Sequence, residues 1–84
     1  KSFEYTIKDE LGIHARPAGL LAKGAKKYSS VCMIEKGGKS VKLSQLMMLM
    51  SLGAKQGDLV KVTAEGEDED TAIAELEKFF NENL

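Results

Sequence analysis

The architecture is set by one stretch, Gly12-Ile13-His14-Ala15-Arg16-Pro17-Ala18, which contains the only histidine and the only proline of the 84-residue chain. Proline is tolerated in the first turn of a helix, because the N–H that it lacks would have no intrahelical partner there. Pro17 therefore predicts that a helix begins here, with His14 at or beside its N-cap.

The same helix start predicts an anion-binding site around His14. The free backbone amides of Ala15 and Arg16, together with the positive end of the helix dipole, favour a bound anion. The planar guanidinium of Arg16 suits phosphate oxygens, and a neutral imidazole can attack a phosphorus centre. A lone histidine is more often an ordinary surface or core residue. The coincidence of this glycine, arginine and proline around it favours a phosphoryl-accepting site with His14 and Arg16 as the reacting and supporting groups.

Outward from this stretch, apolar residues alternate with polar ones in four segments, which predicts four strands. The first spans about residues 2–8, and Gly37-Gly38 supplies a tight turn between the second and third, which form a hairpin. The residues that share one face of each strand are Phe3, Tyr5 and Ile7; Cys32 and Ile34; Val41 and Leu43; and Val60, Val62 and Ala64.

Three helices are predicted between and after these strands. The first runs from Ala15 to about Lys27, a short apolar one lies within residues 44–52 and ends at Gly53, and the last spans about Asp70 to Asn81. The order is βαββαβα, which indicates an α+β open-faced sandwich with the helices on one face of the sheet. The pattern alone does not say which strands pair.

Length and composition limit the function. Eighty-four residues predict a single domain over residues 1–84, and a net charge of −1 without a basic stripe argues against nucleic-acid binding. The single Cys32 is expected to be a small buried hydrophobe, and with one His and one Cys we expect no metal and no cofactor. No apolar run is typical of a membrane span or signal peptide, so we expect a cytoplasmic protein. The acidic run 65–70 lacks the spacing of a calcium site, which favours a solvated turn before the last helix.

Several separated blocks resemble the HPr family, the histidine-containing phosphocarriers of the bacterial phosphoenolpyruvate:sugar phosphotransferase system. The resemblance covers essentially the whole chain. Besides residues 12–18, the matching blocks are Gly37-Gly38-Lys39-Ser40, Met50-Ser51-Leu52-Gly53, Gln56-Gly57 and Ala64-Glu65-Gly66-Glu67-Asp68-Glu69.

This resemblance implies a four-stranded antiparallel sheet with three helices on one face. It implies a carrier, not an enzyme: His14 takes phosphate on Nδ1 from phosphoenolpyruvate-charged enzyme I, supported by Arg16, and donates it to enzyme IIA of sugar transporters. A short amphipathic helix must expose some of its methionines, and the matching segment of the family docks these partners. We therefore expect a monomer whose partner interface comprises Leu46, Met47, Met48, Met50, Ser51 and Gly53.

Three alternatives remain at this stage. The first is the nitrogen-branch phosphocarrier paralogue, which shares the His-Ala-Arg-Pro segment, although blocks 50–53 and 66–69 look more like the sugar branch. The second is a small acylphosphatase-like phosphohydrolase, and the third is a passive binding domain in which His14 is incidental. The chain also departs from HPr proteins regulated by HPr kinase, because Gln45 occupies the position of their regulatory serine and Ser44 lies one residue earlier. The sequence does not indicate which sugars are transported.

Overall fold

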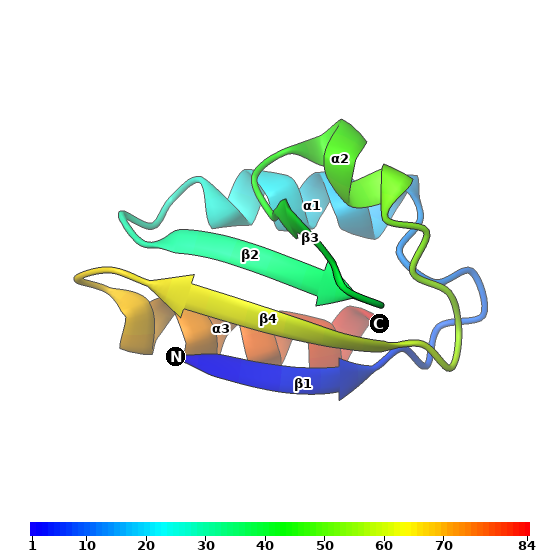
Figure 1. Ribbon diagram of the computed structural model, residues 1–84. Helices are drawn as coiled ribbons and strands as arrows, with labels where there is room; N and C mark the ends of the chain where they lie inside the picture. The colour runs from blue at the N-terminus through cyan, green and yellow to red at the C-terminus, as the bar shows by residue number, and fades with distance from the viewer.

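A computed structural model describes all 84 residues. Its elements follow the expected order βαββαβα (Figure 1). They are β1 (Ser2–Thr6), α1 (Ala15–Ala25), β2 (Val31–Lys36), β3 (Lys39–Lys42), α2 (Leu46–Ser51), β4 (Leu59–Glu65) and α3 (Glu69–Asn83).

Two elements end earlier than the sequence patterns predict. β1 stops at Thr6, because the next residue, Ile7, exchanges backbone hydrogen bonds with the turn at Gly57 and Asp58 instead of with a strand. α1 stops at Ala25, because the amide of Lys27 turns back to the carbonyl of Gly24 at 3.2 Å, a bond that tightens and ends the last turn.

The sheet is fully antiparallel, with strand order β1-β4-β2-β3. Val62 of β4 is paired with Phe3 on one side and with Ile34 on the other, and Ile34 is paired in turn with Val41. Since directly paired residues point to the same side of a sheet, these side chains form one continuous apolar face.

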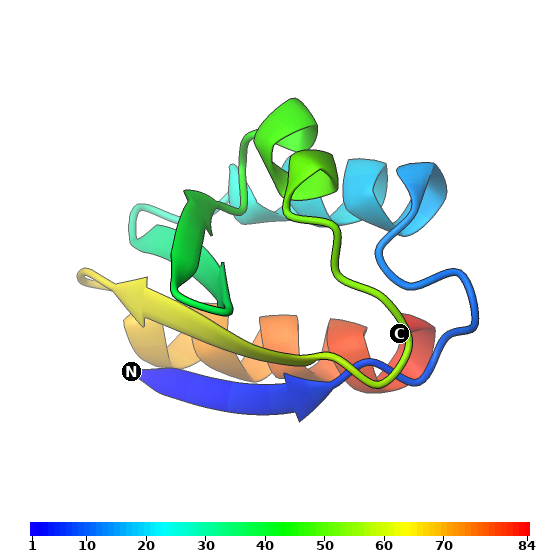
Figure 2. The ribbon, with the colours of Figure 1, turned by 45° about the vertical axis from the view of Figure 1, so that its right-hand side comes forward.

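All three helices cover this apolar face, and the opposite face is open (Figures 1 and 2). Phe80 of α3 is completely buried and makes edge-to-face contacts with Phe3 and Tyr5, at centroid distances of 5.6 and 5.5 Å. α2 packs against α1 and β3 and buries only Leu49. Its other large side chains therefore remain at the surface. None of the helices is both long enough and apolar enough to cross a bilayer.

Candidate functional site

The loop that leads to His14 is held by distant parts of the chain. Gly12 has φ +66°, and a Cβ built on it would lie 2.3 Å from the carbonyl oxygen of Ala54. The next residue, Ile13, is buried and donates its N–H to the same oxygen at 3.1 Å. Only glycine combines this positive φ with so close a backbone approach. The contact fixes the chain immediately before the histidine.

A second attachment comes from the end of α3. The carbonyl oxygen of Leu84 accepts the amides of Lys8 and Asp9, at 2.6 and 2.8 Å. Asp9 then accepts the amide of Gly12 through its own carbonyl, at 3.0 Å. Both ends of the loop before His14 are thus held by backbone hydrogen bonds.

His14 is the N-cap of α1, as Pro17 predicts. Its backbone is extended, with φ −96° and ψ −176°, and its side chain makes no capping hydrogen bond. The first backbone bond of the helix runs from the amide of Ala18 to the carbonyl of His14, at 2.9 Å. The amides of Ala15 and Arg16 therefore lie in the first turn without an intrahelical acceptor, beside a free imidazole.

His14 and Arg16 border a shallow surface depression of about 330 Å³. It is lined by Asp9, His14, Arg16, Pro17, Leu20 and Asn83. Arg16 is exposed and forms no ion pair with an acidic side chain of the chain, so its guanidinium is free for an external anion. Unpaired amides, a guanidinium and an unengaged imidazole suit the transfer of an anionic group at the protein surface.

α2, together with Gly53 two residues after its end, presents the six residues of the expected partner interface at the surface. Met47 is 76% exposed, whereas Leu49 on the opposite side of the same helix is 0% exposed. The hydroxyl of Ser51 donates to the carbonyl of Met48 at 2.8 Å. The six exposed residues, which we call the α2 face, are Leu46, Met47, Met48, Met50, Ser51 and Gly53.

The α2 face is tied to the histidine loop through the residues that follow it. Lys36 donates to the carbonyl of Gly53 at 3.0 Å and forms an ion pair with Asp58 at 3.0 Å. The amide of Lys55, followed by the ammonium of Lys36, holds the pKa of Asp58 below its ordinary value. Since Ala54 lies between these contacts and also accepts the amide of Ile13, α2 and the start of α1 occupy fixed relative positions.

Sequence reasoning missed two exposed leucines around the depression. Leu11 is 71% exposed in the loop before His14, and Leu20 is 50% exposed in the wall of the depression. The local sequence does indicate that Leu20 is exposed. Adjacent positions on a helix point about 100° apart, so Leu20 and Leu21 cannot both face the core. The exposed Lys23 follows Leu20 on α1, and the exposed Lys27 lies just after the end of the helix; both add positive charge.

The acidic run forms a structural turn before α3. Asp68 accepts the amides of Ser29 and Ser30, both at 2.9 Å, and the hydroxyl of Ser30. The hydroxyl contributes most to holding the pKa of Asp68 below its ordinary value. Glu69 and Asp70 occupy the first turn of α3, where the helix dipole favours acidic side chains. No group of three metal-ligating side chains occurs in this turn or elsewhere in the structure.

Comparison with known proteins defines the class as phosphocarriers of the phosphotransferase system. A family model described as the PTS HPr component phosphorylation site matches residues 1–82, and the chain belongs to this HPr family. The histidine-containing phosphocarrier protein of Mycoplasma is 35% identical, with 98% of this chain and 93% of that chain covered and a TM-score of 0.95.

Two further structures extend the comparison. HPr from Thermoanaerobacter tengcongensis is 44% identical, with 100% of this chain and 99% of that chain covered and a TM-score of 0.88. Crh, the catabolite repression HPr of Bacillus subtilis, is 35% identical, with 95% and 92% covered and a TM-score of 0.79, and its crystal structure is a dimer with a swapped domain. These matches confirm the HPr-type fold and the phosphocarrier class.

Proposed function

We propose that His14 is the phosphoryl acceptor of this carrier and that it relays phosphate from phosphoenolpyruvate-charged enzyme I to enzyme IIA of sugar transporters. The observation that carries the proposal is the position of His14 at the N-cap of α1. Its imidazole is unengaged there, and the amides of Ala15 and Arg16 have no intrahelical acceptor. A phosphoryl group on the imidazole would meet these donors directly.

The transfer needs little more than these groups. Nδ1 of His14 attacks phosphorus, a P–N bond forms, and the bond between phosphorus and the donor breaks. The amides of Ala15 and Arg16 and the guanidinium of Arg16 then stabilise the charge on the phosphoryl oxygens. Because the depression is shallow and open, a second protein can bring its own reactive group to the same phosphorus. Phosphate can thus be passed on without release to water.

The α2 face supports the assignment of protein partners. Exposed apolar side chains cluster on a helix whose end is fixed beside the histidine loop, and methionines adapt to several partner surfaces. Arg16 and Lys23 on α1, with Lys27 just after its end, favour partners with acidic surfaces. Blocks 50–53 and 66–69 favour the sugar branch over the nitrogen branch.

We also propose that the chain acts as a single domain over residues 1–84, as a cytoplasmic monomer without a cofactor. Crystal structures of Crh and of HPr from Thermoanaerobacter tengcongensis are of dimers, so the mass in solution tests the monomer proposed for this chain. Light scattering during size-exclusion chromatography should give the mass of one chain. A dimer at the concentrations used in transfer assays would contradict this part of the proposal.

Incubation with phosphoenolpyruvate and enzyme I, followed by intact mass measurement, tests the acceptor. We expect one acid-labile phosphoryl group on the wild-type protein and none on His14→Ala, which should keep its circular dichroism spectrum because the side chain caps no amide. Loss of the label to a sugar-type enzyme IIA would support the sugar branch. Acid-labile phosphate on His14→Ala would overturn the assignment, and catalytic release of free phosphate would favour a phosphohydrolase.

A further inference from the structure

The sulfur atoms of this chain that an oxidant can reach are concentrated on the α2 face. The chain has four methionines, one cysteine and no tryptophan. Three of the methionines lie on α2, where Met47 is 76%, Met48 46% and Met50 39% exposed. The fourth, Met33, is half-buried on the open face of the sheet, because its neighbour Ile34 points toward the helices. An oxidant in solution therefore meets most of its targets on one short helix.

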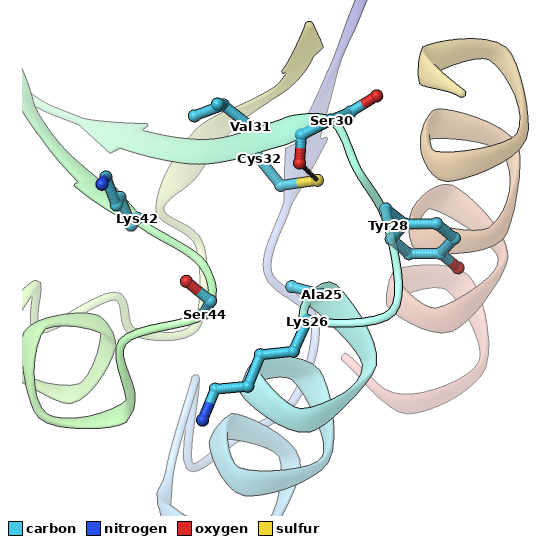
Figure 3. Close-up of a pocket in the computed structure, with 8 residues that line it drawn as sticks. All are labelled: Ala25, Lys26, Tyr28, Ser30, Val31, Cys32, Lys42 and Ser44. Atoms are coloured by element: carbon cyan, nitrogen blue, oxygen red, sulfur yellow. Dashed lines mark hydrogen bonds between the residues drawn. The ribbon is translucent and has the colours of Figure 1, made fainter. Parts of the chain in front are cut away.

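The cysteine competes poorly for such an oxidant. Cys32 is 6% exposed, and its thiol donates to the carbonyl of Ser30 at 3.8 Å in the wall of a pocket at the end of α1 (Figure 3). Burial, followed by the charge of Asp68, raises the pKa of this thiol. Peroxides react with the thiolate and not with the thiol, so Cys32 reacts slowly at neutral pH. The exposed thioethers are the faster targets.

The α2 face can change chemically while its helix stays in place. α2 packs against α1 and β3 and buries only Leu49, which is 0% exposed. An oxygen atom added to the sulfur of Met47 would lie in solvent, so no core contact would be lost. A sulfoxide is nevertheless polar, whereas the thioether is apolar and flexible. The free protein tolerates this change, but an apolar interface would have to bury a polar group without a hydrogen-bond partner.

We propose that the α2 face is a redox modification site, at which a peroxide converts Met47 first, and then Met48 and Met50, to methionine sulfoxide and so weakens the docking of enzyme I. This inference rests on the proposed function, because it requires enzyme I to dock on the α2 face before phosphoryl transfer.

The chemistry balances with hydrogen peroxide as the oxidant. A lone pair of the thioether sulfur attacks one peroxide oxygen, the O–O bond breaks, and the second oxygen leaves as water. The sulfur is oxidised by two electrons and the peroxide is reduced by the same two. Methionine sulfoxide reductases reverse the change at the expense of a thiol reductant, with one enzyme for each sulfoxide epimer. The modification can therefore act as a switch and is not only damage.

Limited treatment with hydrogen peroxide, followed by peptide mass mapping, tests the order of oxidation. We expect one added oxygen atom at Met47 first, and at Met33 and Cys32 last. Initial rates of phosphoryl transfer from phosphorylated enzyme I, measured against chain concentration, then test the effect. KM should rise at least about fivefold, because the docked sulfoxide is an unsatisfied polar group. The kcat and the circular dichroism spectrum should not change, and both reductases together should restore KM.

Two variants locate the effect. The triple variant Met47→Leu/Met48→Leu/Met50→Leu keeps an apolar α2 face without thioethers. Whatever KM it has before treatment, peroxide should leave that value unchanged. Met33→Leu, which removes the only methionine outside α2, is the matched control and should respond to peroxide as the wild-type chain does.

The other outcomes would overturn the proposal. An unchanged KM in a chain that carries sulfoxide at Met47 would show that docking ignores the modification. A peroxide effect that persists in the triple variant would locate its cause outside α2. Oxidation of Met33 or Cys32 ahead of Met47 would contradict the argument from exposure. If the untreated chain accepted no phosphate from enzyme I, the proposed function itself would fail, which is distinct from a failure of the oxidised chain alone to respond.

Discussion

Replacement of Gly12 with alanine should destabilise the protein far more than its single added methyl group suggests. The residue has φ +66°, and the new Cβ would lie 2.3 Å from the carbonyl oxygen of Ala54 and 2.7 Å from Cα of Lys55. Both neighbours are backbone atoms and cannot rotate away. The chain must therefore separate at the point where Ile13 donates to Ala54.

The cost has three parts. A left-handed conformation costs a non-glycine residue about 1–2 kcal/mol, the lost backbone hydrogen bond about 1 kcal/mol, and displacement of packed backbone about 1–3 kcal/mol. Together they predict that Gly12→Ala lowers the free energy of unfolding by about 3–6 kcal/mol, a large share of the stability of a small protein. The phosphorylation rate should also fall, because His14 follows directly.

Urea unfolding compared with Gly37→Ala checks this reasoning. Gly37 has a similar φ of +56°, but an added Cβ would meet no atom within 4 Å. We expect this control to lose only about 1–2 kcal/mol and to keep the wild-type phosphorylation rate. If the two variants were equally stable, the close approach to Ala54 would have no energetic role.

Four further expectations follow from the site and its supports. Arg16→Ala should slow phosphoryl transfer from enzyme I by several tens to a thousandfold, because one charge-assisted contact to the phosphoryl group contributes roughly 2–4 kcal/mol. The free energy of unfolding should not change. Equal transfer rates for mutant and wild type would show that Arg16 is not part of the site. Met47→Glu should weaken enzyme I binding in calorimetry without lowering the melting temperature, because Met47 is exposed. Leu49→Ala, at a buried position of the same helix, should lower the free energy of unfolding by about 2–5 kcal/mol. A large fall in melting temperature for Met47→Glu with unchanged affinity would place Met47 in the core. Folding lowers the pKa of Asp68. The Asp68 carboxylate therefore contributes fully to the free energy of unfolding above its unfolded pKa of ~3.9, and this contribution is lost as pH falls through its lower pKa in the folded protein. Urea titrations should therefore show the difference between wild type and Asp68→Asn shrinking below about pH 4, and a constant difference would contradict this. HPr kinase and ATP should leave the chain unmodified, because Gln45 cannot accept phosphate and Ser44 lies one residue earlier and is half-buried. Acid-stable phosphate mapped to Ser44 would contradict this expectation.

Local signals in the sequence account for the elements and for the position of His14. Alternation in residues 60–64 identifies the inner face of β4, and Pro17 marks the start of α1, because both depend on neighbouring residues only. The same is true of Gly53, whose φ of +71° follows the end of α2. The prediction that α2 exposes some of its methionines is confirmed for the same reason, since a six-residue helix can bury only one side.

Contacts between residues that are distant in the sequence could not be predicted from local sequence patterns. Alternation shows which residues share a face but not which strands are neighbours, so only the structure places β4 between β1 and β2. Gly12 is recognisable as a turn residue, yet nothing in its surroundings indicates Ala54. Asp68 reads as one acid among several, and only the fold brings it to Ser29 and Ser30.

The attachment of the His14 loop to residues 54 and 84 determines when the site can form during synthesis. When residue 14 leaves the ribosome, the carbonyls that hold Ile13, Lys8 and Asp9 have not yet been made. Segments with contacts of high sequence separation order late, since the intervening chain must be closed first. A nascent or truncated chain would therefore carry the histidine without its fixed amides. Partner proteins would encounter a competent acceptor only on chains in which residues 54 and 84 have been made and the domain has folded.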